Sequence, residues 1–482
     1  MKTRLYPLLA LALLAGGCIE DKGNYNYSAL NTIEITGIAT DTTFRVDQFD
    51  TLRLAPVLKF KNETITNLSH EWKINHEVVS TEPALEISIS LEANSSNTYY
   101  AASLIVTDNA TDLKYYKDFR VVVTTSFVSG LFVLSERADE TATLSFQRRD
   151  RPNALFMHDL FEGANPLFGA LGKKPRQIVQ QFYPNQLLGV LCSEGERKLS
   201  LISPTTLELA RGISNETIRG GYTGDFTPAA MNLYLGGMIT GGGKMFGYNY
   251  MGNESVYKPI AADTIEFADW VDTNSSIDSY AWIAYDNKGE RFLKLEQNSD
   301  PLLYDKITPL TVENGLSTAG QKFIAGGVYQ DDVRALTYDP AGKKAYSYGI
   351  PVWYDLDLSN FEMIIHATVT RFSEVANLVN EQSVCLYDTE YWFIANGNVV
   401  KRLHEKGNTP VDWFTAPKGN VTTMTVKSGS SAAGADRLFI ATYDGAKSYI
   451  HEINLATREQ LNAPLELDGK VVFLLAKGTW TL

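Results

Sequence analysis

The sequence predicts an all-β protein in which an immunoglobulin-like sandwich is followed by a seven-bladed β-propeller. Two patterns predict this fold. Short runs of alternating apolar and polar residues fill residues 33–125, and a longer strand–turn–strand pattern recurs over residues 126–482. Hydrophobic residues make up 44% of the 482 residues and charged residues 21%, so the chain has enough apolar material to bury folded cores.

The first 18 residues are typical of a bacterial lipoprotein signal peptide. Lys2 and Arg4 form a basic start, residues 5–14 are mainly apolar, and residues 15–17 are small. The apolar run is too short to cross a bilayer but suits a secretory signal peptide. Small residues before a cysteine resemble the bacterial lipobox, in which the sulfur of Cys18 would receive a diacylglycerol. In the alternative, the segment is an ordinary signal peptide and Cys18 is incidental.

We expect residues 1–17 to form the signal peptide and residues 18–32 to form a tether. Acyl chains on Cys18 would hold the protein firmly at a membrane. Glu20 and Asp21 follow closely, and such an acidic pair resembles the export signal of surface lipoproteins in one group of Gram-negative bacteria. The sequence therefore predicts a lipid anchor in the outer membrane, with the protein facing the cell exterior. In the alternative, the acidic pair is only a solvated tether.

Residues 33–125 are typical of a β-sandwich. Residues 85–89 and 119–123 alternate apolar and polar side chains, and Asn, Thr and Asp turns separate such runs. A period of two indicates half-buried antiparallel strands, and about seven runs of this kind make a sandwich of immunoglobulin size. Trp72 lies in one run and is predicted to be buried in the core. Because no cysteine pair flanks it, apolar packing alone must hold the two sheets together.

From residue 126 the pattern becomes an apolar strand, a tight polar turn and a second strand. It recurs every 45–58 residues, which is the length that a four-stranded propeller blade requires. A Tyr-Asp pair begins at Tyr285, Tyr338, Tyr387 and Tyr443, and three of the four open a turn with a glycine close behind. In such turns Asp caps the backbone locally and Gly supplies a positive φ. Seven landmarks predict seven blades: Phe132, Val190, Leu235, Trp282, Ala335, Phe393 and Phe439.

Two further segments complete the predicted ring. Residues 471–476 are an apolar strand that could pair beside the first blade and close the ring, which would protect its edges. Residues 154–175 break the repeat and are predicted to be a loop or short helix inserted between the first two blades. A large sandwich or jelly roll is the competing architecture.

Residues 18–27, which read Cys-Ile-Glu-Asp-Lys-Gly-Asn-Tyr-Asn-Tyr, resemble the mature start of the PKD-like family of surface lipoproteins. The run ending in Val106-Thr107-Asp108 resembles the late strand of a PKD-type domain. Proteins of this family resemble accessory components of nutrient-uptake loci of the starch-utilisation type. The resemblance implies two partners, a TonB-dependent importer and its substrate-binding lipoprotein, and a role in capturing a peptide or glycan. It supplies no catalytic residues.

The sequence contains no strong catalytic or cofactor motif. A net charge of −13 repels phosphate backbones and argues against a nucleic-acid partner. His-Glu pairs at His70, His404 and His451 lack the second histidine that a zinc site needs four residues later, so no metal and no cofactor are predicted. Cys192 and Cys385 lie in apolar runs and are predicted to be buried free thiols. A glycosidase needs only two carboxylates, so a propeller-fold hydrolase or lyase is an alternative.

The clearest candidate for ligand binding is an aromatic and acidic segment. Trp353 and Tyr354 could stack on a sugar or peptide ring, while Asp355 and Asp357 accept hydrogen bonds. In the alternative, which the residues favour, the aromatic pair packs against the next blade. Weaker candidates of the same kind are residues 248–251, which read Tyr-Asn-Tyr-Met, and Trp413.

These observations predict a lipid-anchored surface protein that binds a peptide or oligosaccharide nutrient, or docks as an accessory subunit on the importer complex. Tethering would raise the effective concentration of the protein beside the importer, so weak recognition would suffice. Two alternatives stand beside this prediction. One is the propeller enzyme that acts on glycans or peptides, and the other is a purely structural scaffold of the importer complex.

Overall fold

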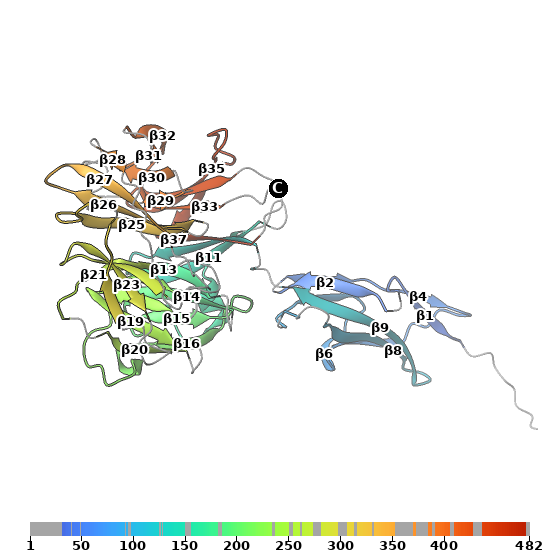
Figure 1. Cartoon of the computed structure of the whole chain (residues 1–482). Helices are drawn as coiled ribbons and strands as arrows, with labels where there is room; N and C mark the ends of the chain where they lie inside the picture. The colour runs from blue at the N-terminus through green and yellow to red at the C-terminus, as the bar shows by residue number, and fades with distance from the viewer. Residues whose placement is uncertain are drawn as a thin grey trace, which may run out of the picture. The chain divides into compact units, whose positions relative to one another are not determined.

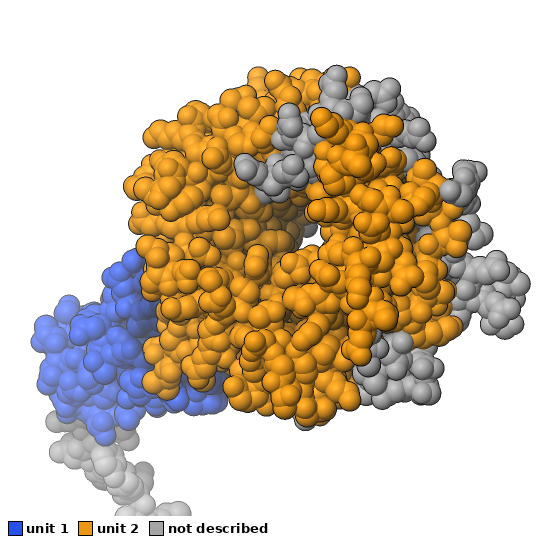
Figure 2. Space-filling model, turned by 90° about the vertical axis from the view of Figure 1, so that its left-hand side faces the viewer, with its two compact units in different colours: residues 1–124 blue, residues 125–482 orange. Residues whose placement is uncertain are grey.

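The computed structural model divides the chain into two compact units, residues Met1–Thr124 and Thr125–Leu482, which are coloured separately in Figure 2. No helix among the residues it describes is long and apolar enough to cross a membrane. The described residues are 31–39, 41–48, 50–91, 93–94, 98–124, 127, 129–149, 156–181, 186–233, 237–249, 254–260, 263–272, 281–296, 306–312, 316–329, 332–351, 370–372, 384–387, 391–404, 409–427 and 436–478.

The first unit is a small β-sandwich with nine strands in its described part (Figure 1). One sheet has five strands, and two pairs of strands complete the unit. In order, the five-stranded sheet is β2 (Thr43–Asp47), β9 (Leu113–Thr124), β8 (Tyr100–Asp108), β5 (Leu68–Ile74) and β6 (Glu77–Ser80); the pairs are β1 (Ile33–Thr36) with β4 (Val57–Phe60), and β3 (Thr51–Leu54) with β7 (Leu85–Ser88).

The sandwich differs from the prediction in two respects. It has nine strands in its described part, more than the expected seven or so, because residues 33–60 form four separate strands of only four or five residues each. In addition, β2 runs parallel to β9, with Thr43 opposite Arg120, although the alternation predicted antiparallel strands. Period-2 alternation reports which face of a strand is buried and carries no information on strand direction.

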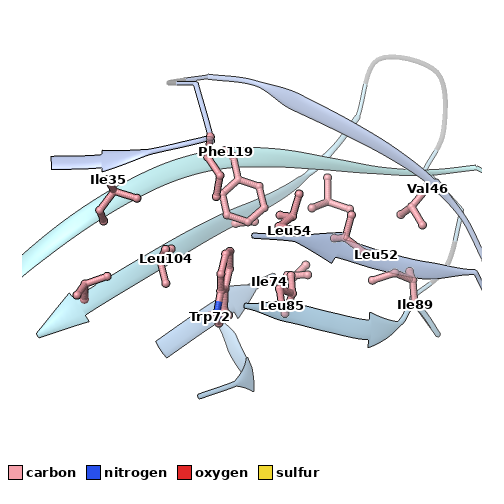
Figure 3. Close-up of a cluster of buried hydrophobic side chains, with 14 of the residues drawn as sticks. Ile35, Val46, Leu52, Leu54, Trp72, Ile74, Leu85, Ile89, Leu104 and Phe119 are labelled. Carbon is pink, nitrogen blue, oxygen red and sulfur yellow. The ribbon is translucent and has the colours of Figure 1, made fainter. Parts of the chain in front are cut away.

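Trp72 is fully buried at the centre of the sandwich core, as predicted. Its ring meets that of Phe119 edge to face, with centroids 6.1 Å apart, and Leu104 packs beside them (Figure 3). The indole Nε1 donates a hydrogen bond of 2.8 Å to the carbonyl of Glu82, so burial leaves no donor unpaired. Apolar contact between the sheets is therefore what holds this unit together.

The second unit contains seven four-stranded antiparallel sheets within its described residues, which confirms the predicted seven-bladed propeller (Figure 1). We number the blades from 1 to 7. Blade 1 contains β37 (Lys470–Lys477), β10 (Gly130–Glu136), β11 (Ala142–Arg148) and β12 (Phe156–Met157); blade 2 contains β13 (Lys173–Gln181), β14 (Leu187–Glu194), β15 (Leu199–Ile202) and β16 (Leu209–Ile213); blade 3 contains β17 (Ala230–Asn232), β18 (Met238–Gly241), β19 (Lys244–Asn249) and β20 (Ser255–Pro259); blade 4 contains β21 (Phe267–Asp272), β22 (Ala281–Asp286), β23 (Arg291–Glu296) and β24 (Lys306–Pro309).

The remaining three blades follow the same order from the inner strand outward. Blade 5 contains β25 (Lys322–Tyr329), β26 (Asp332–Asp339), β27 (Lys344–Pro351) and β28 (Thr370–Phe372); blade 6 contains β29 (Val384–Leu386), β30 (Tyr391–Asn396), β31 (Val399–His404) and β32 (Val411–Thr415); blade 7 contains β33 (Asn420–Lys427), β34 (Arg437–Tyr443), β35 (Lys447–Asn454) and β36 (Leu465–Asp468). The predicted insertion between the first two blades holds the short helix α2 (Leu160–Ala164).

The apolar landmarks of the sequence mark one particular strand of each blade. Six of them lie on the second strand, which has a hydrogen-bonded neighbour on each side and neighbouring blades over both faces. Burial on both faces explains why these strands are continuous apolar runs rather than alternating ones. Leu235, the seventh landmark, lies outside the described residues.

The blades form a closed ring around a central hollow, which Figure 2 shows in the second unit. The inner strand of each blade contacts that of the next, from β13 through β17, β21, β25, β29 and β33 to β37, and β37 contacts β13. β37 is also paired antiparallel with β10, with Val133 opposite Leu474. The chain therefore closes the ring by placing its last described strand inside blade 1, as the apolar run at residues 471–476 predicted.

Apolar and ionic contacts both join blade 7 to blade 1. Leu131 and Val133 of β10 share a buried cluster with Phe439 of β34. Beside this cluster, the buried carboxylate of Glu452 lies 2.8 Å from the guanidinium of Arg149 in the other blade. A buried ion pair of this kind is sensitive to geometry and therefore disfavours other ways of closing the ring.

Aspartates cap the turns between the second and third strands, as the Tyr-Asp pairs predicted. The Oδ1 atom of Asp339 accepts hydrogen bonds from the backbone N–H groups of Ala341 and Gly342, each at 2.9 Å. Asp444 caps its turn in the same way through the N–H groups of Ala446 and Lys447. Local side-chain caps fix these turns without long-range contacts, which is why the sequence shows them so clearly.

The turn between β36 and β37 has no room for a side chain at Gly469. Gly469 has a φ of +80°, and an added Cβ would lie 2.6 Å from the backbone oxygen of Glu136 in β10. The Gly469 carbonyl accepts a hydrogen bond of 2.8 Å from the hydroxyl of Ser448, which in turn accepts one of 2.9 Å from the N–H of Val471. A side chain at this position would push apart the strands that close the ring.

We predict that Gly469→Ala lowers the free energy of unfolding by about 2–4 kcal/mol, because it adds a steric clash to the cost of a positive φ. Gly445→Ala is the matched control: its φ is +101°, but an added Cβ would have no neighbour within 4 Å. It should cost about 1 kcal/mol. Urea unfolding of the two variants measures the difference. Equal losses would show that Gly469 is not packed against β10.

Candidate functional site

A cleft of about 950 Å³ lies between blades 7 and 1, beside the strands that close the ring. Its size is at the upper end of the range of about 300–1,000 Å³ that small-molecule sites usually have. Blade 1 contributes the ends of β10 and β11 and the segment after β12, and blade 7 contributes the β34–β35 and β36–β37 turns. The lining residues are Ser135, Glu136, Arg137, Ala138, Thr143, Ser145, His158, Asp159, Tyr443, Gly445, Ala446, Lys447, Glu466, Leu467, Asp468, Gly469 and Lys470.

Three hydroxyl side chains of blade 1 line the cleft from one face of the sheet. Ser135 pairs with Thr143 across β10 and β11, and Ser145 lies two residues further along β11, so all three project to the same side. Their exposed fractions are only 3%, 6% and 5%. The hydroxyls of Ser135 and Ser145 make no hydrogen bond to any residue that the structure describes. The oxygen atoms of these two hydroxyls face the open space of the cleft, so both are available to a bound molecule.

A β-bulge lies next to these hydroxyls. The register between β10 and β37 shifts between Leu134 and Ser135, where β37 contains one additional residue. Bulges of this kind re-aim side chains and are common beside functional sites. The bulge marks the point where the apolar contact between blades 7 and 1 ends and the cleft begins.

The outer wall of blade 1 is held by an ion-pair network around Asp159. This residue has a φ of +50°, and its Oδ1 atom accepts hydrogen bonds from the Thr143 hydroxyl and the Arg137 guanidinium, both at 2.7 Å. The Thr143 bond, assisted by Arg137, holds the pKa of Asp159 below its usual range. Arg137 also lies 2.8 Å from Glu162. Burial would lower the pKa of Arg137, but the two carboxylates outweigh burial and raise it.

The opposite wall comes from turns of blade 7. The ammonium of Lys447 pairs with Glu466 of β36, and this hydrogen bond raises the pKa of Lys447. The Tyr443 hydroxyl donates a hydrogen bond of 2.8 Å to the carbonyl of Gly445 and so fixes its own ring against the turn. Each wall of the cleft therefore contains a cation, Arg137 in blade 1 and Lys447 in blade 7, that already has a carboxylate partner.

The lining of the cleft is rich in hydrogen-bonding groups. Within the described ranges, no group of three or more His, Cys, Asp and Glu side chains is placed to hold a metal ion. The cleft offers hydroxyls, carboxylate oxygens and ammonium hydrogens, which can hydrogen-bond a polar molecule from several sides. Cys192 is buried as predicted, whereas Cys385 is only half-buried. Desolvation raises the pKa of each thiol to about 12, so both free thiols are poor nucleophiles at neutral pH.

The residues that the sequence singled out do not form this cleft. Trp353, Tyr354, Asp355 and Asp357 lie outside the described residues, as do Cys18, Glu20 and Asp21. Of the weaker candidates, Tyr248 and Trp413 are buried, with exposed fractions of 1% and 7%, and their rings are therefore not open to a ligand; Tyr250 and Met251 lie outside the described residues. Tyr248 and Trp413 each pack in a core between blades, which is what an aromatic residue in a propeller strand usually does.

Sequence reasoning missed the hydroxyl side chains, although a signal was present. Thr143 and Ser145 alternate with apolar residues in a strand whose blade should be covered on both faces. Polar residues at every second position of such a strand indicate that part of one face is not covered by the neighbouring blade. The position of the cleft itself depends on the distant turns of blade 7, and no local pattern encodes it.

A family model described as the PKD-like family matches residues 18–175, which is about a third of the chain. The match includes the sandwich and continues through β10, β11, β12 and α2 into the start of β13. It therefore includes the blade 1 wall of the cleft. No curated protein sequence matches the chain.

Several solved structures are similar in overall arrangement. A quinonprotein alcohol dehydrogenase-like protein from Bacteroides thetaiotaomicron is 12% identical, with 91% of this chain and 97% of that chain covered and a TM-score of 0.49. The periplasmic gluconolactonase PpgL of Pseudomonas aeruginosa is 9% identical, with 72% and 98% covered and a TM-score of 0.46. Similarity at this level carries no argument about activity. A PKD-like segment joined to a propeller indicates a binding or scaffold role.

We predict that Thr143→Val raises the pKa of Asp159 towards the ordinary value of about 3.9. Because the folded pKa lies below the unfolded one, Asp159 adds stability above about pH 4 and loses it as the pH falls through the folded pKa. The variant should therefore be less stable at pH 7 by about 0.5–1 kcal/mol, a small amount because the carboxylate is partly screened by water.

Urea unfolding at pH 7 and at pH 3 tests this prediction, with Thr143→Ser as the control that keeps the hydroxyl. The difference between the Val and Ser variants should shrink at pH 3. A difference that is the same at both pH values would mean that packing, and not the hydrogen bond to Asp159, causes it.

Proposed function

We propose that the protein is a lipid-anchored component of the outer-membrane surface, and that its propeller binds a nutrient beside a TonB-dependent importer. The observation that carries the binding part is the cleft, where the hydroxyls of Ser135 and Ser145 face open space and bond to no other residue that the structure describes. Hydroxyls that converge on a cleft of this size can hydrogen-bond a small polar molecule.

The amino-terminal residues support the anchored part of the proposal. Small residues precede Cys18, and the acidic pair Glu20 and Asp21 follows it. Acylation of Cys18 would confine the propeller to the membrane surface, where the importer and its substrate-binding lipoprotein also lie. Confinement raises the effective concentration of the bound nutrient at the importer, so a modest affinity is sufficient.

Calorimetry on the chain from Ile19 onward tests the binding function. We expect saturable heat with neutral oligosaccharides or with a peptide digest, and unchanged ligand in mass spectrometry after long incubation. Appearance of a product would favour the propeller hydrolase or lyase. No binding to any ligand, together with co-purification of the importer, would favour the purely structural scaffold.

Localisation is tested by variants of the amino-terminal segment. Cys18→Ser should abolish palmitate incorporation and move the protein out of the membrane fraction, since the lipid is its only proposed anchor. Changing Glu20 and Asp21 together to Ala should keep the lipid but protect the protein from protease added to intact cells. Lys22→Ala is the matched control and should change neither property. Membrane retention of the Cys18 variant would contradict the anchor.

A further inference from the structure

We propose that the cleft between blades 7 and 1 binds a neutral oligosaccharide and discriminates against peptides and acidic glycans. This inference rests on the proposed binding function and specifies its ligand.

The charges of the cleft disfavour an anionic ligand. Arg137 is already paired with Asp159 and Glu162, and Lys447 with Glu466. The lining contains four carboxylates against three cationic side chains, and the whole chain has a net charge of −13. An acidic glycan would have to displace a carboxylate from one of these ion pairs and enter a negative field. A neutral molecule can bind without either of these unfavourable steps.

The hydroxyls suit a ligand whose own groups both donate and accept hydrogen bonds. Ser135 and Ser145 each offer one donor and two acceptor sites, and both lie on the same face of blade 1. Asp468 adds acceptor oxygens and Lys470 adds donors at the other side. Adjacent sugar hydroxyls can bond to such groups in either direction, while a peptide backbone offers one donor and one acceptor per residue at fixed spacing.

The cleft lacks the apolar pocket that a peptide side chain would need as an anchor. Its aliphatic lining consists of Ala138, Ala446 and the largely buried Leu467. Two rings lie at the cleft, and both are held in place: His158 packs edge-on against Phe156 with centroids 4.6 Å apart, and Tyr443 is fixed by its hydrogen bond to Gly445. Fixed rings beside hydrogen-bonding groups favour a sugar face over a flexible apolar side chain.

The test uses the full mature chain and three probes: a panel of neutral hexasaccharides of glucose, mannose and xylose, polygalacturonate, and a tryptic digest of casein. We expect calorimetric binding to at least one neutral hexasaccharide and none to the other two probes. Ser135→Ala combined with Ser145→Ala should weaken that binding by about 10-fold or more, since each substitution removes a hydrogen bond to the ligand.

Two further variants separate the cleft from general effects. Ala446→Trp places a large ring at an exposed position of the cleft and should abolish binding without disturbing the core. Ser200→Ala is the matched control, because Ser200 is a buried serine on the corresponding strand of blade 2 whose hydroxyl bonds to Leu171. The affinity of the Ser200→Ala variant for the hexasaccharide should equal that of the unmodified chain.

The outcomes distinguish this inference from the function on which it rests. Binding of the casein digest or polygalacturonate that Ala446→Trp abolishes would overturn the neutral-sugar assignment and leave the binding function intact. Hexasaccharide binding that neither the double serine variant nor Ala446→Trp affects would place the site elsewhere and overturn the inference. Failure of all probes to bind would count against both the inference and the binding function.

Discussion

Antiparallel pairing of β37 with β10 is the interaction on which the second unit depends. Without this pairing, blade 1 would have only three strands with a bare edge at β10, and β37 would be an unpaired strand; exposed edges of this kind invite association with other chains. Pairing the last described strand with a strand from the beginning of the unit removes both edges at once. It also makes blade 1 a composite of two distant segments, so the ring cannot be completed until the whole unit has been synthesised.

The cleft is a consequence of this closure. Blade 7 must end and β37 must begin at the same place, and the tight turn at Gly469 brings β36, β37 and β10 together there. Apolar side chains such as Val133 pack between blades 7 and 1 beside the bulge at Ser135, whereas most side chains that line the cleft are hydroxylated or charged. A site at this junction is built from both ends of the second unit, so its geometry depends on the fold being closed.

The sequence predicted much of the fold because the relevant signals are local. Landmarks such as Phe132 and Trp282 identified the second strands, and the aspartate-capped turns identified where those strands end. The parallel pairing of β2 with β9 was missed because alternation does not encode direction. The cleft was missed because Ser145 and Lys447 are brought together only by ring closure. Tyr248 and Trp413 are buried by packing between neighbouring blades, which a local pattern of aromatic residues does not distinguish from an exposed binding surface.

Hydrogen–deuterium exchange of the full mature chain, with and without a saturating oligosaccharide, probes closure and recognition in one experiment. The account predicts that β37 exchanges as slowly as β10 in the free protein, and that the sugar adds protection to β10, β11 and the β36–β37 turn. Rapid exchange of β37 as a frayed terminal strand, or sugar-dependent protection confined to blades 3 to 5, would contradict the account.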